Sequence, residues 1–301
     1  MTNNITGFYE ELVAHGLIVP SGVEGAFGRG EVFEDVLDRF NALITRVSRD
    51  DGAEVYTFPP VIDRRILERV DYLDSFPQLV GCVHAFSGDS RAANVLSARV
   101  HAGEPWGDLM DQTAVSMNPA ACYPLYPILQ GTLPPKGRLV TMTNWVYRHE
   151  PSHEPTRMLS FRVREFVRAG SPDDVVAWRD DWLQRGLEIL LSLGLAAKSA
   201  VASDPFFGRA GKLLSEGQEA QKLKFEVLVP VISLEAPTAI CSFNYHRDHF
   251  GQVFGIRTHS GEVAHTACLG FGLERVVMAL FKTHGFEPIA WPQNVRSRLW
   301  P

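Results

Sequence analysis

The stretch Val146–Phe166, which reads VYRHEPSHEPTRMLSFRVREF, decides how this sequence is interpreted. Before it, Leu139–Tyr147 (LVTMTNWVY) is rich in β-branched and aromatic residues that alternate, as in a strand. Arg148 and Glu150 stand two apart and share a face if that strand continues. A polar loop then leads to a second alternating segment, formed by Leu159, Phe161, Val163 and Glu165. The stretch therefore predicts a long β-hairpin.

The charged and aromatic residues of this hairpin suit a nucleotide. Arg148 would lie on a phosphate, Phe161 on a purine ring and Glu150 on its exocyclic amine. An ordinary surface hairpin with an ion pair explains the same spacing equally well, so the pattern alone leaves both interpretations open.

Length, charge and cysteine spacing restrict the class of protein to which the chain can belong. The chain has 301 residues, 45% hydrophobic, and a net charge of -6, which suits one large domain over 1–301. No long Lys/Arg run is present, so extensive tRNA or DNA binding by this chain alone is not expected. Neither a membrane span nor a signal peptide is visible. Cys82, Cys122, Cys241 and Cys268 are too irregularly spaced for a disulfide framework, which favours a cytoplasmic protein with reduced thiols.

The periodicity elsewhere predicts an α+β fold, with helices packed on an antiparallel β-sheet. Helices are expected over about 31–49 and 173–193, and strands over 54–58 and 225–234. Residues 1–30 end in a glycine-rich turn, and 208–224 are polar and form a helix or a mobile insertion, within about 200–225.

A second informative segment is HTACLGFGLERVVMAL, His265–Leu280. Gly270 and Gly272 allow a tight turn from a strand into a helix over 273–281, which places Arg275 in the first helical turn. A helix N-terminus with an arginine attracts phosphate. A glycine-containing joint with a surface arginine explains the segment as well.

Taken in order, three segments resemble the signature motifs of class II aminoacyl-tRNA synthetases. Val55–Pro60 (VYTFPP) resembles the first motif, Val146–Glu165 the second and Gly270–Arg275 the third. Within that class the sequence is most similar to seryl-tRNA synthetase, over about residues 25–285. The resemblance implies an antiparallel catalytic domain and a homodimer built on the strand that ends at Pro60.

Two departures from seryl-tRNA synthetase refine the resemblance. Few residues precede the first motif, which leaves no room for the helical arm that holds tRNA. The segment Asn118–Cys122 (NPAAC) also replaces Thr-Ala-Glu, and Cys268 lies in the third motif. This pattern resembles the atypical, zinc-dependent seryl-tRNA synthetases. It is still more similar to the tRNA-armless amino acid:[carrier protein] ligases.

The resemblance to these ligases implies a zinc site formed by Cys122, Glu165 and Cys268, with the substrate amine in the open position. Thiolates and a carboxylate suit zinc, and three protein ligands leave a fourth position free. From the residues alone, two buried structural cysteines and an ion-paired Glu165 would be the simpler interpretation. Cys82 and Cys241 are expected to be core thiols.

The same resemblance assigns the ATP site. Arg148 would hold the α-phosphate and Arg275 the γ-phosphate, and these two arginines would stabilise charge during adenylation. The other ATP-binding residues implied are Glu150 at the adenine amine, Arg157 and Met158 beside the adenine, and Phe161 stacked on it.

The segment Leu234–Phe250 departs most from the family. Ala239, Ile240 and Cys241 would contact ATP through the backbone, but Ala239 stands where the family has an acid for Mg²⁺. Glu235 is near this position but out of register, so the Mg²⁺ ligands are left open. Lys224 is either a phosphate contact or a solvated lysine.

Together these features predict an ATP-dependent ligase that adenylates glycine or alanine on zinc, with Mg²⁺ accompanying ATP. It would pass the aminoacyl group to the phosphopantetheine thiol of a carrier protein, without tRNA and away from membranes. Two rivals remain: a synthetase that recruits tRNA through residues 1–30 or a partner, and a non-catalytic amino-acid sensor.

Overall fold

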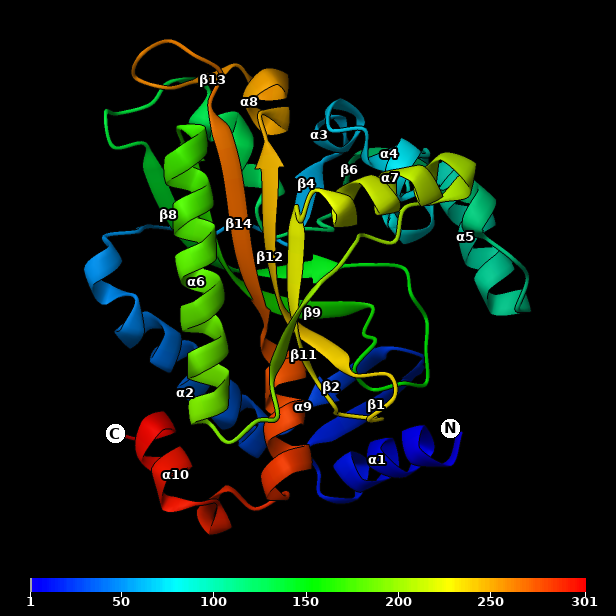
Figure 1. Ribbon diagram of the computed structural model, residues 1–301. Coiled ribbons are helices and arrows are strands. Elements are labelled where there is room, and N and C mark those ends of the chain that lie inside the picture. The colour runs from blue at the N-terminus through cyan, green and yellow to red at the C-terminus, as the bar shows by residue number, and fades with distance from the viewer. Residues whose placement is uncertain (1) are drawn as a thin grey trace.

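The fold is built on a seven-stranded sheet, seen in a computed structural model that describes the backbone of residues 2–301 and the side chains of 7–207 and 211–301 (Figure 1). Across the sheet the strands are β10 (Lys198–Val201), β11 (Lys224–Val229), β12 (Thr238–Arg247), β14 (His265–Gly272), β9 (Ser160–Gly170), β8 (Arg138–Tyr147) and β3 (Glu54–Tyr56). Neighbouring strands are antiparallel except β3 and β8. This arrangement confirms the predicted α+β class.

The predicted hairpin is the pair β8 and β9. Its register runs from Arg138 opposite Ala169 to Tyr147 opposite Ser160. Because side chains alternate along a strand, each residue of β9 that faces helices is followed by one that faces the other side of the sheet. Register and alternation therefore fix which hairpin residues can share a site.

Three helices cover one face of the sheet: α2 (Glu31–Val47), α6 (Pro172–Ser192) and α9 (Leu273–His284). Figure 1 shows α6 lying along the sheet in front of β14. It begins at Ser171, whose hydroxyl accepts a hydrogen bond from the Asp174 N–H, a normal N-cap. The predicted helices over 31–49 and 173–193 thus agree with the structure to within about two residues, the usual uncertainty of helix ends.

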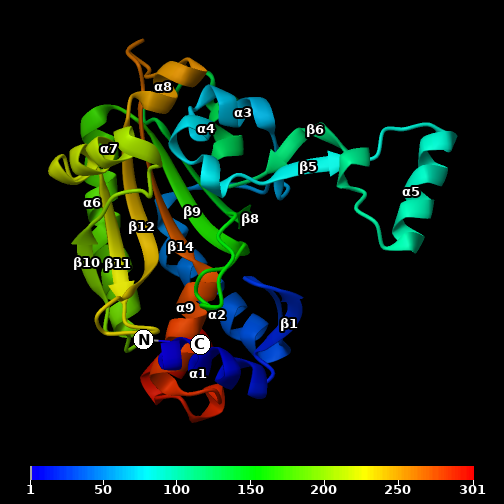
Figure 2. The ribbon, with the colours of Figure 1, turned by 90° about the vertical axis from the view of Figure 1, so that its right-hand side faces the viewer.

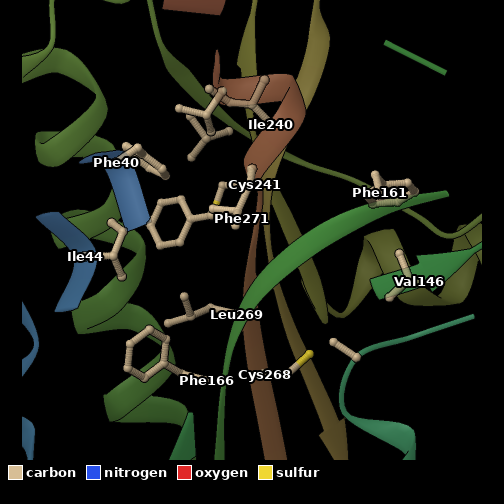
Figure 3. Close-up of a cluster of buried hydrophobic side chains, with 14 of the residues drawn as sticks. Phe40, Ile44, Val146, Phe161, Phe166, Ile240, Cys241, Cys268, Leu269 and Phe271 are labelled. Atoms are coloured by element: carbon tan, nitrogen blue, oxygen red, sulfur yellow. The ribbon is translucent and has the colours of Figure 1, made fainter. Parts of the chain in front are cut away.

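The core between these helices and the sheet is aromatic. Phe40 of α2 meets Phe271 of β14 edge-on at 5.7 Å between ring centroids, and Phe166 of β9 packs on Trp182 of α6 at 5.0 Å. Figure 3 shows Phe166, Leu269 and Phe271 on this side of the strands, with Phe161 and Cys268 directed to the other side. The second face is therefore free to form a site.

A smaller layer lies beside the second face. It contains the three-stranded sheet β4 (Val61–Asp63), β6 (Asp111–Met117) and β5 (Cys82–Ala85), with α3 (Arg64–Arg69), α4 (Tyr72–Ser75) and the 3-10 helix η4 (Tyr123–Leu129). Helix α5 (Ser90–Ala102) joins β5 to β6 and projects away from the body (Figure 2).

The remaining α-helices and strands lie around these layers. They are α1 (Thr2–Ala14), β1 (Ile18–Val23), β2 (Ala26–Arg29), β7 (Gly131–Thr132), α7 (Gly208–Ala220), α8 (His249–Phe254), β13 (Ile256–Arg257) and α10 (Gln293–Leu299). Of the two interpretations of 208–224, the helix agrees with α7. In the described residues, none of the helices has the length and apolar character needed to cross a bilayer.

Four expectations need correction. The strand expected over 225–234 ends at Val229, because Pro230 has no N–H for the ladder. Cys82 is exposed on the edge strand β5 and is not a core thiol. The supposed turn over 25–30 contains β2. Gly270 lies inside β14 without a positive φ, so the strand runs straight into α9 and the expected tight turn is absent.

Candidate active site and metal centre

A cavity of about 530 Å³ lies on the second face of the sheet. Strands β9, β11, β12 and β14 form its floor, and α4, η4 and α8 contribute to its walls. Phe161, Val163 and Glu165 line it from β9, as the predicted alternation requires. Polar groups that are distant in the sequence therefore meet in one pocket.

Two arginines and an aromatic ring form one end of the cavity. The guanidinium carbon of Arg148 lies 5.8 Å from the Phe161 ring centroid, and that of Arg275 lies 5.7 Å from it. Both distances fall within cation–π range. The structure thus brings together three residues that the sequence assigned to a nucleotide.

Backbone carbonyls hold both guanidinium groups in place. Arg275 donates from Nε to Thr156 O at 2.9 Å and from Nη1 to Ala239 O at 3.0 Å, while Arg148 Nε donates to Pro119 O at 3.2 Å. Burial, followed by the charge of Arg148, lowers the pKa of Arg275, which shows how strongly this end of the cavity concentrates positive charge. Such a site favours an anion.

The predicted metal ligands form a second cluster in the same cavity. One ligand atom from each of Cys122, Glu165 and Cys268 lies within 4.8 Å of the others, and all three residues are buried. Cys122 precedes η4, whereas register places Glu165 opposite Gly270, two residues along β14 from Cys268. Residues up to 146 positions apart in sequence are thus joined at one point (268 − 122).

The chemistry of this cluster fits a zinc ion. A hydrogen bond with Cys268 and then burial raise the pKa of the Cys122 thiol, and burial likewise raises the pKa of Glu165. Three acidic groups crowded without a cation disfavour one another's ionised forms. A divalent cation reverses this effect, because it stabilises thiolate and carboxylate together. Two thiolates and one carboxylate would leave a position open for a substrate group.

Gly270 keeps space beside these ligands. A Cβ at this position would lie 2.9 Å from a Val163 methyl group and 4.0 Å from Glu165 Cγ. Any larger side chain would therefore fill the cavity between Glu165 and Cys268. This close approach, and not a turn, accounts for the glycine.

Cys268 also has two nitrogen neighbours that sequence reasoning missed. Asn244 Nδ2 donates to its Sγ at 3.4 Å, and His246 Nε2 lies 3.5 Å from the same atom. Burial lowers the pKa of His246 to about 3, so the ring is neutral, and its Nδ1 lies 3.0 Å from Thr266 Oγ1. The alternation of β12 could have revealed both, since Asn244 pairs with Cys268 across the strands.

Lys224 is buried, so its interpretation as a solvated lysine is wrong. Its Nζ contacts Asp204 at 2.7 Å and Glu226 at 3.0 Å, and all three residues line the cavity. Burial lowers the pKa of Lys224, but the charges of Asp204 and Glu226 outweigh this and raise it. Glu226 was missed, although it lies two residues after Lys224 and so shares its face; Asp204 gave no sequence signal.

Several other predicted ATP residues have different positions. Ala239, Ile240 and Cys241 line the cavity, and Ala239 contributes its carbonyl to Arg275. Arg157 pairs with Glu154 and is not among the lining residues; neither is Met158, which is buried beside Arg29. Glu235 is exposed outside the cavity. Glu226, which pairs with Ser242 across the sheet, is an acid that does line the cavity.

The chain was compared with known proteins, and no family model matches it. Two proteins of Bradyrhizobium diazoefficiens, amino acid–[acyl-carrier-protein] ligases 1 and 2, are each 44% identical to it over 289 residues. These alignments cover 95% of this chain and 88% and 86% of the two relatives. A type-2 serine–tRNA ligase of Methanopyrus kandleri is 28% identical over 282 residues, 85% of this chain and 53% of that protein.

Solved structures show the same fold. M. kandleri SerRS in complex with A. aeolicus tRNASec superposes with a TM-score of 0.81 and 24% identity, over 97% of this chain and 60% of that one. A Giardia lamblia prolyl-tRNA synthetase in complex with prolyl-adenylate gives a TM-score of 0.69 at 14% identity, over 93% and 52% of the two chains. These confirm the predicted class II synthetase fold.

Proposed function

The chain belongs to the family of amino acid–[acyl-carrier-protein] ligases, and on this premise we propose its reaction in detail. With ATP, it activates a small amino acid, glycine or alanine, as the aminoacyl-adenylate. It then transfers the aminoacyl group to the phosphopantetheine thiol of a carrier protein. Zinc is the resident metal, and Mg²⁺ accompanies ATP.

One observation carries this proposal: a single cavity contains both the arginine pair and the Cys122–Glu165–Cys268 cluster. The first group suits phosphates and the second suits a metal-bound amine. An amino acid held by its amine at the cluster would direct its carboxylate towards an α-phosphate at Arg148. Adenylation needs this juxtaposition more than it needs proton transfer.

The residues of the chain would act mainly by charge and position. Arg148 and Arg275 would neutralise the phosphate oxygens as pyrophosphate leaves, and their carbonyl contacts fix them before the substrate arrives. The Phe161 ring of β9, within cation–π distance of Arg148 and Arg275, would support the adenine. When bound by Cys122, Glu165 and Cys268, zinc would supply a Lewis-acid site for the α-amino group.

The restriction to a small amino acid is supported by the walls next to the metal cluster. Tyr126 of η4 stacks on Phe250 of α8, with the ring centroids 3.8 Å apart. His246 packs edge-on against Phe250 at 4.9 Å. Of these rings, those of His246 and Phe250 line the cavity, where they would limit the size of a substrate side chain.

The proposal includes a homodimer and no dependence on tRNA. β3 is a three-residue edge strand, and Val55 on it is 78% exposed. Exposed apolar edges of this kind are usually covered by another chain. The net charge of -6 gives no general attraction to a polynucleotide.

The decisive experiment has two stages. Pyrophosphate exchange into ATP is measured with a panel of amino acids, on protein whose metal content has been determined. Candidate carriers, with and without phosphopantetheine, are then analysed by mass spectrometry. We expect exchange with glycine or alanine, zinc bound to the protein, and a mass increase of one aminoacyl residue on the phosphopantetheinylated carrier alone.

Two results would contradict the proposal. Absence of exchange with every amino acid would exclude adenylation. Exchange followed by charging of bulk tRNA, with no carrier modified, would instead identify a tRNA synthetase.

A further inference from the structure

Tyr126 is a buried polar residue of η4, the 3-10 helix that begins directly after the candidate ligand Cys122. It is 0% exposed, and no described side chain or backbone group forms a hydrogen bond with its hydroxyl oxygen. A buried hydroxyl without a partner is costly, so native proteins rarely keep one without a reason. A simple packing role would be served better by phenylalanine.

The surroundings of the hydroxyl indicate what it is for. Tyr126 lies in η4 four residues after Cys122, the N-cap of that helix, and its ring meets the His246 ring edge-on at 6.2 Å between centroids. His246 Nε2 in turn lies 3.5 Å from Cys268 Sγ. A tyrosine hydroxyl is a neutral O–H donor at neutral pH, and these contacts place the Tyr126 side chain beside the cluster of candidate ligands. The ring is fixed, because it stacks on Phe250 with only 10° between the planes.

The two candidate sulfur ligands differ in the donors around them. Cys268 Sγ has Asn244 Nδ2 at 3.4 Å and His246 Nε2 at 3.5 Å. For Cys122, the other sulfur, the Tyr126 hydroxyl four residues along the same segment is a buried polar group without a partner among the described residues. A thiolate is a much stronger acceptor than a thiol, so the hydroxyl gains its partner when Cys122 becomes a metal ligand.

We propose that Tyr126 is a positioning residue for the metal centre, whose hydroxyl donates a hydrogen bond to the Cys122 thiolate. The inference rests on the proposed function, since it assumes that Cys122, Glu165 and Cys268 bind zinc. It goes further by assigning a role to a residue outside the ligand set. Hydrogen bonds of this kind orient ligands, and removing one typically weakens metal binding about 10-fold to 100-fold.

The test uses Tyr126→Phe in the full-length protein, because this change removes one oxygen and keeps the stacked ring. Zinc affinity is measured by competition with a chromophoric chelator. We expect the variant to bind zinc about 10-fold more weakly than the unchanged protein. With Co²⁺ as the probe, its thiolate-to-metal charge-transfer band should move to lower energy, since a thiolate without the donor is easier to oxidise.

The stability of the metal-free protein gives a further readout. Without metal, Tyr126→Phe should resist urea as well as or better than the unchanged protein, because an unpartnered hydroxyl has been removed. Tyr56→Phe is the matched control: its hydroxyl lies on β3 and accepts a hydrogen bond from Arg138. That variant should keep the zinc affinity and the Co²⁺ spectrum unchanged.

Each contrary outcome has its own meaning. Equal zinc affinity and an unshifted Co²⁺ band in Tyr126→Phe would overturn the inference, as would a loss of stability in the metal-free variant. Failure of the unchanged protein to bind zinc would instead contradict the zinc-dependent part of the proposed function.

Discussion

Glu274 offers a sharp test of how the fold supports the site. This residue of α9 is 0% exposed, one position before Arg275. Its carboxylate accepts hydrogen bonds from the Arg162 backbone N–H at 2.8 Å and from Arg162 Nε at 2.9 Å, and Arg29 Nε lies 3.4 Å away. It therefore connects the strand that presents Phe161 to the helix that presents Arg275.

The expected cost of losing this carboxylate follows from these contacts. Glu274→Ala removes the acceptor of the partly buried Arg162 N–H and of Arg162 Nε, together with the negative charge beside Arg29. Arg162 keeps Glu34 at 2.7 Å and Arg29 keeps Ser160 O at 3.1 Å. Breaking a buried ion pair from one side costs about 3–5 kcal/mol. Glu274→Gln keeps one acceptor and removes the charge, so about 1.5–3 kcal/mol is expected, the usual value of a hydrogen bond to a charged group.

Urea unfolding at fixed protein concentration measures both losses, because the apparent stability of the proposed homodimer would depend on concentration. Glu68→Gln is the control, since Glu68 forms an exposed helical pair with Arg64 at 3.7 Å. It should lose at most about 1 kcal/mol. A Glu274→Ala variant no less stable than this control would refute the reasoning. A rise in KM for ATP in Glu274→Gln should accompany the loss of stability.

Four further outcomes are expected. Cys122→Ala should keep its fold by circular dichroism but lose bound zinc and pyrophosphate exchange; exchange that survives would exclude an amine held on zinc. Burial raises the pKa of Asp204, but the charge of Lys224 and the hydrogen bonds from Gln218 and Lys224 together lower it by more, so the net pKa is lowered. Its contribution to stability is therefore present above about pH 4 and disappears as the pH falls through the folded-state pKa. Asp204→Asn should flatten this acid limb of the urea midpoint. Gly270→Ala, which places a Cβ 2.9 Å from a β9 valine methyl, should cost about 1–3 kcal/mol by overpacking. Gly217→Ala in α7, where nothing lies within 4 Å, should gain about 0.5–1 kcal/mol.

Local patterns account for what the sequence could predict. The β8–β9 hairpin is visible because its residues alternate with period two, and that alternation alone places Phe161 and Glu165 on one face. Helix α2 is visible for the corresponding reason, with apolar residues at helical spacing. The ligand set came from the resemblance to a family, since two cysteines 146 positions apart carry no local signal (268 − 122).

The residues that were missed depend on contacts between elements. Asp204 lies in a loop and becomes part of the cavity only because Lys224 on β11 reaches it. Tyr126 looks like one more aromatic residue of an apolar segment. Its importance lies in the absence of a described hydrogen-bond partner, which depends on η4, α8 and β14 packing together. No spacing rule contains that information.

The arrangement also explains why one face of the sheet can serve two different substrate groups. Positive charge is concentrated at Arg148 and Arg275, while acids and thiols are concentrated at Glu165, Cys122 and Cys268. In a pocket of low dielectric, charges at the two ends would interact strongly with the charged groups of a substrate. In the proposed reaction, an amino acid with its amine at the cluster and its carboxylate at the arginines would be oriented before it reacts. Two thiolates and one carboxylate carry more negative charge than Zn²⁺ neutralises, so the loaded cluster would disfavour the carboxylate end of a reversed amino acid.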